Sequence, residues 1–484
     1  MDWKKSKRLL VMLACVYWVM AVAIYAIGHE QFRYQRVTTA SLSPAYHIGE
    51  LVDGMEVRQR VTVPADELES VYLKVGTFQR ENAGLLRVAL IDDGDRTLAQ
   101  GQADVAAMAD GQFVAIPLEE PLTGCKDQPL TLLITTEGCA SGSAVTIYAG
   151  NMISTGRFDI AQQIDEADCY RIGEETGTGM LCMELHGSNE LSFYRVYWFA
   201  IAGVFLLLTL YALLAWRAAR KGKSNLLALV LTVYCRYGFL VRQLVSRDFK
   251  TKYKRSVLGM LWSFLNPLLT MLVQYVVFST LFRSDIPNFP VYLISGIVFF
   301  NFFNEAVAMG MNAITGNAAL IKKVYMPKYI YPISKIFSSL INFALSLLPM
   351  LLVILLTGTP IRPSMLLIVF DILCLVGFTM GMALILSTAM VFFQDMQFLW
   401  GIISMIWMYL TPIFYPESII PGRFIRLYHM NPLYQYITFA RTCVMDGVSP
   451  APQAYLWCLG SSLVVLALGL VFFKREQDRF IMYL

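Results

Sequence analysis

Residues 9–27 read LLVMLACVYWVMAVAIYAI, an almost unbroken apolar run near the start of the chain. A helix needs about 20 such residues to cross the hydrocarbon core of a bilayer, so this run is long enough to span a membrane. Basic residues precede it, namely Lys4, Lys5, Lys7 and Arg8. Because segments rich in Lys and Arg stay in the cytoplasm, residues 1–28 are predicted to form a cytoplasmic tip and a first transmembrane helix.

The composition extends this prediction to the rest of the chain. Of the 484 residues, 56% are hydrophobic and 15% are charged, whereas soluble domains carry about 25% charged residues. Residues 29–193 hold 25 acidic and 11 basic residues, and the remainder holds 10 and 28. An acidic soluble segment is therefore inserted into a basic membrane protein. Basic residues beside apolar spans suit anionic lipid head groups and argue against nucleic acid as a partner.

A second apolar span, residues 197–215 within 194–222, is followed by a basic cluster that places this end in the cytoplasm. The acidic segment between the two spans is therefore expected to be extracytoplasmic. Six further apolar stretches occur at residues 257–282, 289–312, 330–357, 364–393, 398–414 and 454–473. Basic residues after the second and the last of these keep the adjoining loop and the C-terminus inside. The sequence thus predicts a multi-pass plasma-membrane protein with about eight transmembrane helices and both termini cytoplasmic.

The acidic segment, residues 29–193, has the pattern of β-structure. Short stretches rich in β-branched and aromatic residues alternate with Gly, Asp and Pro, at 57–63, 71–78, 85–91, 113–118, 130–135 and 145–149. This rhythm predicts an all-β, jelly-roll-like sandwich. In strand rhythm the segment resembles a carbohydrate-binding module. A spacer or assembly domain is an equal alternative, because a fold alone does not give function.

Four cysteines lie in this segment, Cys125, Cys139, Cys169 and Cys182. Outside the cytoplasm they could form two disulfides, and pairing of sequence neighbours, Cys125 with Cys139 and Cys169 with Cys182, is the simplest of three connectivities. Four unpaired thiols are equally compatible with the sequence.

Motifs for nucleotide and metal chemistry are missing from the sequence. Gly222-Lys223-Ser224 has the ending of a phosphate-binding loop, but Arg217 occupies the position of its first glycine. The four histidines are isolated, and no Cys/His cluster has the spacing of metal ligands. We therefore expect a protein that is not an enzyme, with no catalytic residue and no metal or cofactor of its own.

Three segments in the second half form a more specific pattern. Residues 247–262 read RDFKTKYKRSVLGMLW, residues 317–327 read NAALIKKVYMP, and residues 409–416 read YLTPIFYP, with Asn431-Pro432 beyond them. Residues 226–245 are apolar but interrupted by Arg236 and Arg242, which favours a helix lying in the membrane surface. The second segment predicts a short amphipathic helix that ends before Pro327.

In this order the segments resemble the membrane subunit of ABC-2-type transporters, in the branch that exports polysaccharides, O-antigens and teichoic acids. The resemblance covers about residues 236–484, and Gln394 stands where the family usually carries Arg. It implies a six-helix core over residues 257–484 with re-entrant helices near 416–447. It also implies a homodimer of permeases paired with two copies of a separate ATPase, which would bind ATP and Mg²⁺.

The resemblance further implies roles for particular residues. An interface helix within 223–256 would sense closure of the ATPase through Arg247, Asp248, Lys250, Lys252, Tyr253, Lys254 and Arg255. A coupling helix seated on the ATPase would contain Asn317, Ala319, Leu320, Ile321, Lys322, Lys323, Tyr325 and Pro327. Contact with lipid phosphate is the alternative for the two lysines, and a plain membrane anchor is the alternative for the first segment.

Aromatic and polar residues within the spans are candidates for a glycan conduit, because sugars stack their C–H faces on aromatic rings. These candidates are Trp262, Phe299, Phe302, Phe303, Glu305, Trp407 and Tyr409. Lipid-facing belts and ordinary packing are the alternative for each ring, and packing against a partner helix is the alternative for Glu305.

The sequence therefore predicts the membrane subunit of an ATP-driven exporter that moves a lipid-linked polysaccharide or a teichoic-acid-like polymer. Two other functions are compatible with the same features. One is an ABC exporter of small lipids or drugs, and the other is a membrane sensor or scaffold with a ligand-binding outer domain.

Overall fold

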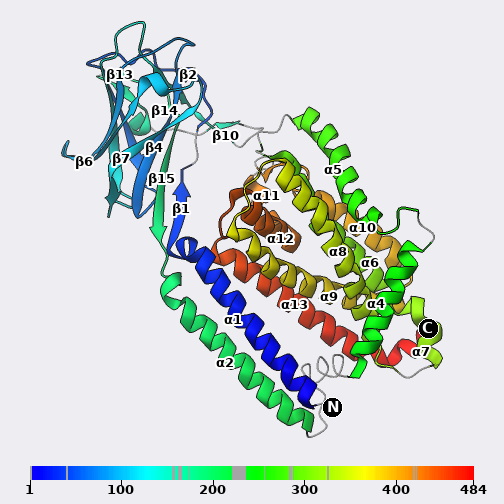
Figure 1. The fold of residues 1–484 in the computed structure, drawn as a ribbon. Helices are drawn as coiled ribbons and strands as arrows, with labels where there is room; N and C mark the ends of the chain where they lie inside the picture. The colour runs from blue at the N-terminus through cyan, green and yellow to red at the C-terminus, as the bar shows by residue number, and fades with distance from the viewer. Residues whose placement is uncertain are drawn as a thin grey trace. The chain divides into compact units, whose positions relative to one another are not determined.

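The computed structural model describes residues 3–39, 42–154, 159–161, 166–173, 175–220, 236–254, 257–282, 286, 288–323, 326–417, 420 and 422–484. The chain divides into two compact units, one formed by Met1–Gln31 with Phe193–Leu484 and the other by Phe32–Ser192. Figure 1 shows that the first unit is helical and that the second is built from strands. The two units are described separately below.

The unit Phe32–Ser192 is an antiparallel β-structure, as the sequence predicts. Its strands are β1 (Tyr34–Thr38), β2 (Tyr46–His47), β3 (Glu56–Thr62), β4 (Glu67–Gly76), β5 (Leu85–Ile91), β6 (Thr97–Asp104), β7 (Phe113–Thr123), β8 (Pro129–Glu137), β9 (Thr146–Gly150), β10 (Met152–Ser154), β11 (Asp159–Ala161), β12 (Arg171–Ile172), β13 (Glu175–Thr176), β14 (Met180–Leu181) and β15 (Met183–Glu190). Each of the six predicted stretches overlaps one of these strands, and the stretches at 57–63, 71–78 and 145–149 extend one or two residues beyond it. In strands such as β3 and β8, buried and more exposed residues alternate, because successive side chains point to opposite faces of a strand.

The strands follow the order β1-β15-β4-β7-β6-β5-β8-β3-β12-β13. β7 and β6 are paired at one position alone, Gly101↔Leu118. This weak link divides the sheet into two halves, one from β1 to β7 and the other from β6 to β13 in the order above. A Cβ on Gly101 would lie 2.3 Å from the Pro117 carbonyl oxygen, so this close approach requires glycine. Residues from both halves bury one hydrophobic core, which includes Leu73, Leu90 and Ile134.

The chain enters and leaves this unit on neighbouring strands. β1 pairs with β15 from Tyr34↔Glu190 to Thr38↔His186. Beyond the last pair, the Leu191 amide donates to the Arg33 carbonyl at 2.7 Å. The two ends of the unit are thus held together by backbone hydrogen bonds.

The two neighbour disulfides considered from the sequence are not formed, because Cys125, Cys139 and Cys182 carry free thiols. Cys125 precedes β8 and Cys139 follows it, and β8 has nine residues. An extended strand of that length spans about 30 Å, whereas a disulfide needs Cα atoms within about 7 Å. Burial raises the pKa of Cys182 to about 11, so its thiol stays protonated at neutral pH.

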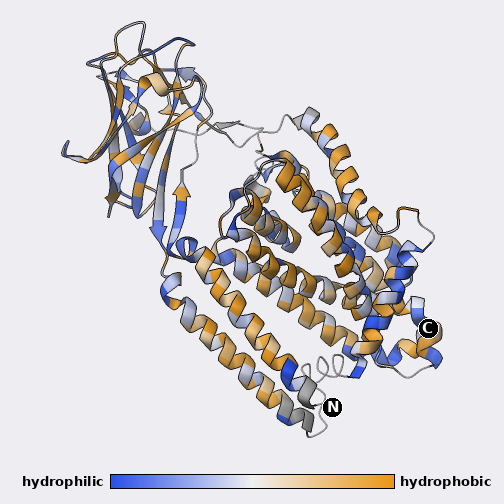
Figure 2. Cartoon of the chain, in the orientation of Figure 1, coloured by the Kyte–Doolittle hydropathy of each residue, from blue (hydrophilic) through white to orange (hydrophobic). Residues whose placement is uncertain are grey.

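The helical unit contains α1 (Trp3–Arg33), α2 (Phe193–Arg220), α4 (Gly238–Tyr253), α5 (Leu261–Phe282), α6 (Phe289–Met311), α7 (Ala318–Lys323), α8 (Ile330–Leu356), α9 (Ile368–Phe392), α10 (Met396–Tyr409), α11 (Gly422–His429), α12 (Pro432–Arg441), α13 (Pro452–Glu476) and α14 (Phe480–Tyr483). Among the described residues, seven helices are long and apolar enough to cross a membrane: α1, α2, α5, α6, α8, α9 with the turn before it, and α13 with the residues after it. Figure 2 shows hydrophobic residues along most of their length.

The eighth predicted span, residues 398–414, is shorter than expected. α10 has 14 residues, fewer than the roughly 20 that a span needs. It ends at Tyr409 because Pro412 lacks an amide hydrogen and disfavours helical geometry at the residue before it. Among the described residues, seven long apolar helices and the short apolar helix α10 thus correspond to the eight predicted apolar stretches.

α6 lies at the centre of the helical unit, and the first two helices form a pair. In α6, 72% of the membrane-length window is buried, against 11% in α5. α6 contacts α5, α8, α9, α10 and α12. α1 and α2 are joined by two hydrogen bonds of 2.7 Å, from the Tyr17 hydroxyl to the Ile201 carbonyl and from the Tyr197 hydroxyl to the Ala21 carbonyl.

Candidate functional site

The segment predicted as a coupling helix folds into the short helix α7. A 3-10 turn, Thr315–Asn317, leads into it, and the Asn317 amide donates to the Ala313 carbonyl at 2.8 Å. Ile321 is buried against its own chain, in a cluster with Ala313, Ile314, Tyr331, Leu384, Val391, Phe473 and Phe480, and Leu320 packs against this cluster. The exposed residues of this turn and helix are Gly316, Ala319, Lys322 and Lys323. α7 is therefore held by its apolar side and presents a small, cationic face outward; Tyr325 lies outside the described residues.

Lys328 connects the region after α7 to the end of the chain. Its Nζ donates to the Gln477 carbonyl and lies 5.7 Å from the centroid of the Phe480 ring. Burial lowers the pKa of Lys328, and the nearby Asp478 carboxylate partly opposes this shift. The C-terminal turns thus help to hold the platform on which α7 sits.

Within the segment predicted as an interface helix, residues 223–256, Gly238–Tyr253 forms α4, which packs against α8, and residues 223–235 lie outside the described residues. Asp248 of α4 forms an ion pair with Lys335 of α8, in which Oδ2 lies 2.8 Å from Nζ. Only 9% of the Asp248 side chain is exposed. Arg247 lies 3.2 Å from the other carboxylate oxygen. Lys250, Lys252 and Lys254 are exposed, and Arg255 lies outside the described residues. One carboxylate thus fastens a basic helix to a membrane helix.

A second set of polar contacts joins α4 to α6. Lys252 Nζ lies 2.8 Å from Glu305 Oε1, and the Asn342 amide donates to the same oxygen at 2.8 Å. The Tyr253 hydroxyl donates to Asn342 Oδ1 at 3.0 Å and also contacts the Ser263 hydroxyl. Glu305 therefore packs against partner helices, as one of the two sequence interpretations held. Side chains from α4, α5, α6 and α8 meet at this point.

Sequence reasoning missed two members of these contacts, Lys335 and Asn342. Both lie on α8, 87 and 37 residues from their partners in the chain, so no local spacing links them. Their only sequence signal is general: a polar residue inside an apolar span must face protein or water.

Residues 411–416, the Thr-Pro-Ile-Phe-Tyr-Pro segment, and the later Asn431-Pro432 form one structure. Asn431 Oδ1 accepts from Trp407 Nε1 at 2.8 Å and from the Leu433 amide at 3.1 Å. The Asn431 amide donates to the Thr411 hydroxyl at 2.9 Å. One side chain thus caps α12 and ties it to the end of α10. The short helices α11 and α12 lie in the region where re-entrant helices are predicted.

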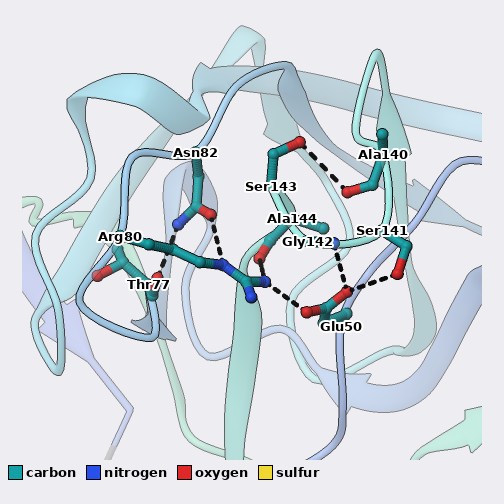
Figure 3. A network of polar contacts seen from close by, with 9 residues as sticks. All are labelled: Glu50, Thr77, Arg80, Asn82, Ala140, Ser141, Gly142, Ser143 and Ala144. Carbon is teal, nitrogen blue, oxygen red and sulfur yellow. Dashed lines mark hydrogen bonds and ion pairs between the residues drawn. The ribbon is translucent and has the colours of Figure 1, made fainter.

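A loop of the β unit carries a different polar cluster. Phe78 and Gln79 follow β4 with φ of 55° and 54°, a left-handed conformation that a bulky residue rarely adopts. Figure 3 shows what holds the loop: the Arg80 guanidinium donates to Glu50 at 2.5 Å and to the Ala144 carbonyl, and Asn82 bridges Arg80 to the Thr77 carbonyl. The Gly142 amide and Arg80 lower the pKa of Glu50.

This loop exposes an aromatic ring. Phe78 is 38% exposed, the Arg80 guanidinium lies 4.8 Å from its centroid, and the His47 ring meets it edge-on at 5.4 Å. Strained backbone persists only where its surroundings fix it, and it concentrates at functional sites. The ring is therefore presented outward by a strained and well-supported loop.

Comparisons with known proteins agree with this architecture. The family described as ABC-2 type transporter matches residues 239–445. The O-antigen export system permease protein RfbA of Myxococcus xanthus is 30% identical over 259 residues, which are 53% of this chain and 98% of that protein. This chain belongs to the ABC-2 transporter family.

Further ABC-2 relatives support the same assignment. A Klebsiella pneumoniae protein, also an O-antigen export system permease protein RfbA, is 31% identical over 250 residues, 50% of this chain and 95% of that protein. The polysialic acid transport protein KpsM of Escherichia coli is 25% identical over 245 residues, 49% and 93% respectively. As an ABC-2 permease, the chain is a multi-pass membrane protein and works with an ATPase partner. The β unit lies outside the matched family region.

In this ABC-2 permease, the conduit candidates fall into two groups. Phe299, Phe302 and Phe303 are buried by their own chain, where they pack with Phe343, Phe378 and Trp407. Trp262 on α5 is 47% exposed and Tyr409 on α10 is 59% exposed. Trp262 and Tyr409 therefore offer the most ring surface to a molecule passing outside this protomer, whereas Glu305 and Trp407 are only partly exposed.

The exposed side of α10 also borders a cavity of about 390 Å³ between α10 and α11. It is lined by Ile403, Ile406, Trp407, Leu410, Leu427, Tyr428, Met430, Asn431 and Pro432. Apolar side chains form most of this wall, with the rings of Trp407 and Tyr428 among them.

Proposed function

We propose that this ABC-2 permease is the membrane subunit of an ATP-driven exporter that moves a lipid-linked polysaccharide or a teichoic-acid-like polymer across the cytoplasmic membrane. Relatives named for O-antigen export and polysialic acid transport support this substrate class. The observation that carries the proposal is the fastening of α4 to the membrane helices by Lys252–Glu305 and Asp248–Lys335. A cytoplasmic helix held in this way passes the movement of an attached ATPase to the spans.

In this proposal, the energy comes from an ATP-binding-cassette subunit that binds ATP and Mg²⁺. The outward face of α7, with Lys322 and Lys323, suits a partner surface that carries carboxylates. Because Ile321 fixes α7 to its own chain, a push on this face moves the surrounding platform as well. Two permeases and two ATPases complete the assembly by twofold symmetry.

The proposed topology follows from the basic residues. Lys4, Lys5, Lys7 and Arg8 would hold the N-terminus in the cytoplasm, and Lys474 and Arg475, in the last turn of α13, would do the same for the C-terminus. In this proposal four helices, α1, α2, α5 and α6, cross the membrane before α7, which therefore lies on the cytoplasmic side. Four more cross after it, α8, α9, α13 and the short α10, so the C-terminus is cytoplasmic as well. The unit Phe32–Ser192 then falls on the outer side, between α1 and α2. The polymer path is proposed along the exposed sides of α5 and α10, where Trp262 and Tyr409 supply rings for sugar stacking.

The β unit is proposed to bind the exported glycan through Phe78. A pyranose can lay its C–H face on the exposed ring, and His47 and Arg80 lie beside the ring where sugar hydroxyls would come. A spacer role would not require the strained loop that presents this ring.

The coupling part of the proposal is tested by charge reversal on α7. Lys322→Glu combined with Lys323→Glu is expected to abolish co-purification of the ATPase and export of polymer, because like charges would then face each other. The control is Arg426→Glu, an exposed charge reversal on α11, which should leave ATPase binding unchanged. Normal export by the double variant would favour the sensor or scaffold function.

The substrate class is tested by depleting the protein from its host. Retention of full-length polymer inside the cells is the expected result. If polymer export continues while a small lipid accumulates, the exporter of small lipids or drugs is the correct function.

Glycan binding is tested with the full-length protein in nanodiscs and the host's delipidated surface polysaccharide as the probe. Phe78→Ala should weaken binding by about tenfold, which is the loss of 1.4 kcal/mol and within the range for an aromatic contact. Phe78→Trp should retain binding, and Phe113→Ala, which removes another ring of the β unit, serves as the control. If the wild type and the three variants bind the polysaccharide equally well, Phe78 does not bind glycan and the β unit is assigned the spacer role.

A further inference from the structure

α6 carries a polar contact near each of its ends. Glu305, near the C-terminal end, pairs with Lys252 of α4. Tyr292, near the N-terminal end, lies against Arg441 at the end of α12. At 1.5 Å per residue, about 20 Å of helix separates the two. α6 therefore touches the interface helix at one end and the re-entrant region at the other.

The contact at the N-terminal end is centred on Arg441, which is only 7% exposed. Its guanidinium donates to the carbonyls of Pro412 at 2.8 Å, Tyr292 at 3.0 Å and Ile413 at 3.2 Å. It also lies 3.4 Å from the centroid of the Tyr292 ring. Irregular backbone at membrane depth needs donors supplied by the protein, and Arg441 supplies them to residues 412 and 413.

Two neighbours complete this contact. The Tyr292 hydroxyl donates to the Tyr415 carbonyl at 2.7 Å and lies 3.0 Å from that of Pro412. Gly296 leaves the space for the guanidinium, because a Cβ there would lie 2.9 Å from an Arg441 nitrogen and 3.0 Å from Ile413. Four groups thus converge from α6, α12 and the segment between α10 and α11. We call this set, Tyr292, Gly296, Arg441 and the carbonyls of residues 412, 413 and 415, the arginine clamp.

The helix between the two contacts is suited to act as one body. α6 has 23 residues and its proline lies in the first turn, whereas α5 and α8 contain Pro267 and Pro349 in their interiors. Most of α6 is buried among neighbouring helices. Packed, uninterrupted helices move as rigid elements between discrete arrangements.

We propose that Arg441 is a positioning residue for export: it fastens residues 411–416 and α12 to α6, so that displacement of α4 at Lys252 moves the re-entrant region. This inference rests on the proposed function, since it requires an ATPase that moves α4. Arg441 touches no substrate in this scheme. It acts by making residues 411–416 and α12 move together with α6.

Hydrogen–deuterium exchange of the full permease–ATPase complex in nanodiscs tests the link. In the wild-type complex, trapping the ATPase with ATP and vanadate should change exchange in peptides covering α11 and α12. Lys252→Glu should abolish that change, because two like charges would face each other at Glu305. Lys252→Glu combined with Glu305→Lys should restore it.

The outcomes of this experiment are distinguishable. If Lys252→Glu leaves the nucleotide-dependent change in α11 and α12 intact, α6 is not the link and the inference is overturned. If the charge-swapped protein assembles and hydrolyses ATP without restoring the change, the inference is also overturned. If the wild-type chain binds no ATPase at all, it is the proposed function that fails.

Variants of the clamp test the role of Arg441 directly. Arg441→Gln should leave assembly and basal ATP hydrolysis near the wild-type level and lower polymer export by at least about tenfold, a typical size for a coupling effect. Arg441→Lys should recover part of the export. Tyr292→Phe keeps the ring beneath Arg441 and removes only the hydroxyl, so it tests the clamp even where Arg441→Gln fails to fold. Unchanged export in Tyr292→Phe together with Arg441→Gln would overturn the proposal.

Discussion

The carboxylate of Asp248 joins two helices of the permease, because it lies 2.8 Å from Lys335 Nζ on α8 while belonging to α4. With 9% of the Asp248 side chain exposed, water has little access to replace the lysine. Removing one partner of such a pair leaves an uncompensated charge, which costs more than the pair contributes to stability. The position of α4 therefore depends strongly on one side chain of α8.

Lys335→Met tests this dependence. We expect the free energy of unfolding to fall by about 2–3 kcal/mol, because among the described residues Asp248 then keeps an ion pair only with the exposed Arg247. Thermal unfolding of the purified protein in detergent measures the change. Lys335→Arg keeps the charge and serves as the control, and an unchanged melting temperature for Lys335→Met would show that Asp248 does not need this partner.

The loop that presents Phe78 should respond to acid through Glu50. The Gly142 amide and Arg80 lower the pKa of Glu50 from its ordinary value of 4.5. A carboxylate with a lowered pKa stabilises the fold above its unfolded pKa and loses this contribution as the pH falls through the folded pKa. Hydrogen exchange of residues 77–82, corrected for intrinsic rates, should be slow at pH 5–7 and accelerate as the pH falls below 4.5.

Glu50→Gln provides the comparison. This variant should exchange faster than the wild type at pH 7 and show little further change on acidification. A wild-type loop that exchanges at the same corrected rate at pH 3 and pH 7 would contradict the assigned role of Glu50.

At the scale of elements, the end of α10 and the start of α12 form one joint. Asn431 accepts from Trp407 on α10 and from the Leu433 amide of α12, and it donates to Thr411 between them. The chain can therefore reverse direction after a helix of only 14 residues. Exposed polar backbone in this region would otherwise be costly.

Asn431→Ala removes all three contacts at once. We expect a loss of about 2 kcal/mol, since a helix N-cap alone contributes about 1 kcal/mol and the Trp407 indole loses its acceptor. Asn431→Asp keeps the acceptor and loses the donation to Thr411, so it should be milder. Equal stability of Asn431→Ala and the wild type in chemical denaturation would contradict this account.

The elements were largely predictable, and their ends were not. Apolar runs predicted the long helices because burial in lipid leaves no alternative to an internally bonded helix. The run at 398–414 forms a shorter helix than its hydropathy predicts, because hydropathy ignores Pro412, which ends α10 early. Within the site, the short cationic α7 was predictable from its amphipathic pattern. Lys335 and Asn342 were not, because their contacts span long chain separations.

At the scale of the whole molecule, Phe32–Ser192 forms a compact unit of its own. Among the residues that the structure describes, its hydrophobic core is made of residues of that unit, from Leu51 to Leu185. A segment that buries its own core and is bounded by short connections meets the physical requirements of an independent domain. The acidic charge of this unit suits a soluble surface.

Residues 32–192 expressed alone should therefore fold. We expect a monomer with the circular dichroism of a β protein and a single cooperative unfolding transition. Leu73→Ala, at a fully buried position, should lower the free energy of unfolding by about 3 kcal/mol in the isolated unit. An aggregated or unfolded product would show that the unit depends on the helical part of the chain.

The pairing of β1 with β15 has a consequence for how this permease came to be built. A domain whose first and last strands are adjacent and hydrogen-bonded can be inserted into a tight turn between two helices without moving the helices apart. A single recombination event at that turn could exchange the whole β unit for another while α1 and α2 kept their hairpin. Permeases with the same membrane core are then free to diversify what they display beyond it, and genomes can be searched for such grafts at the equivalent turn.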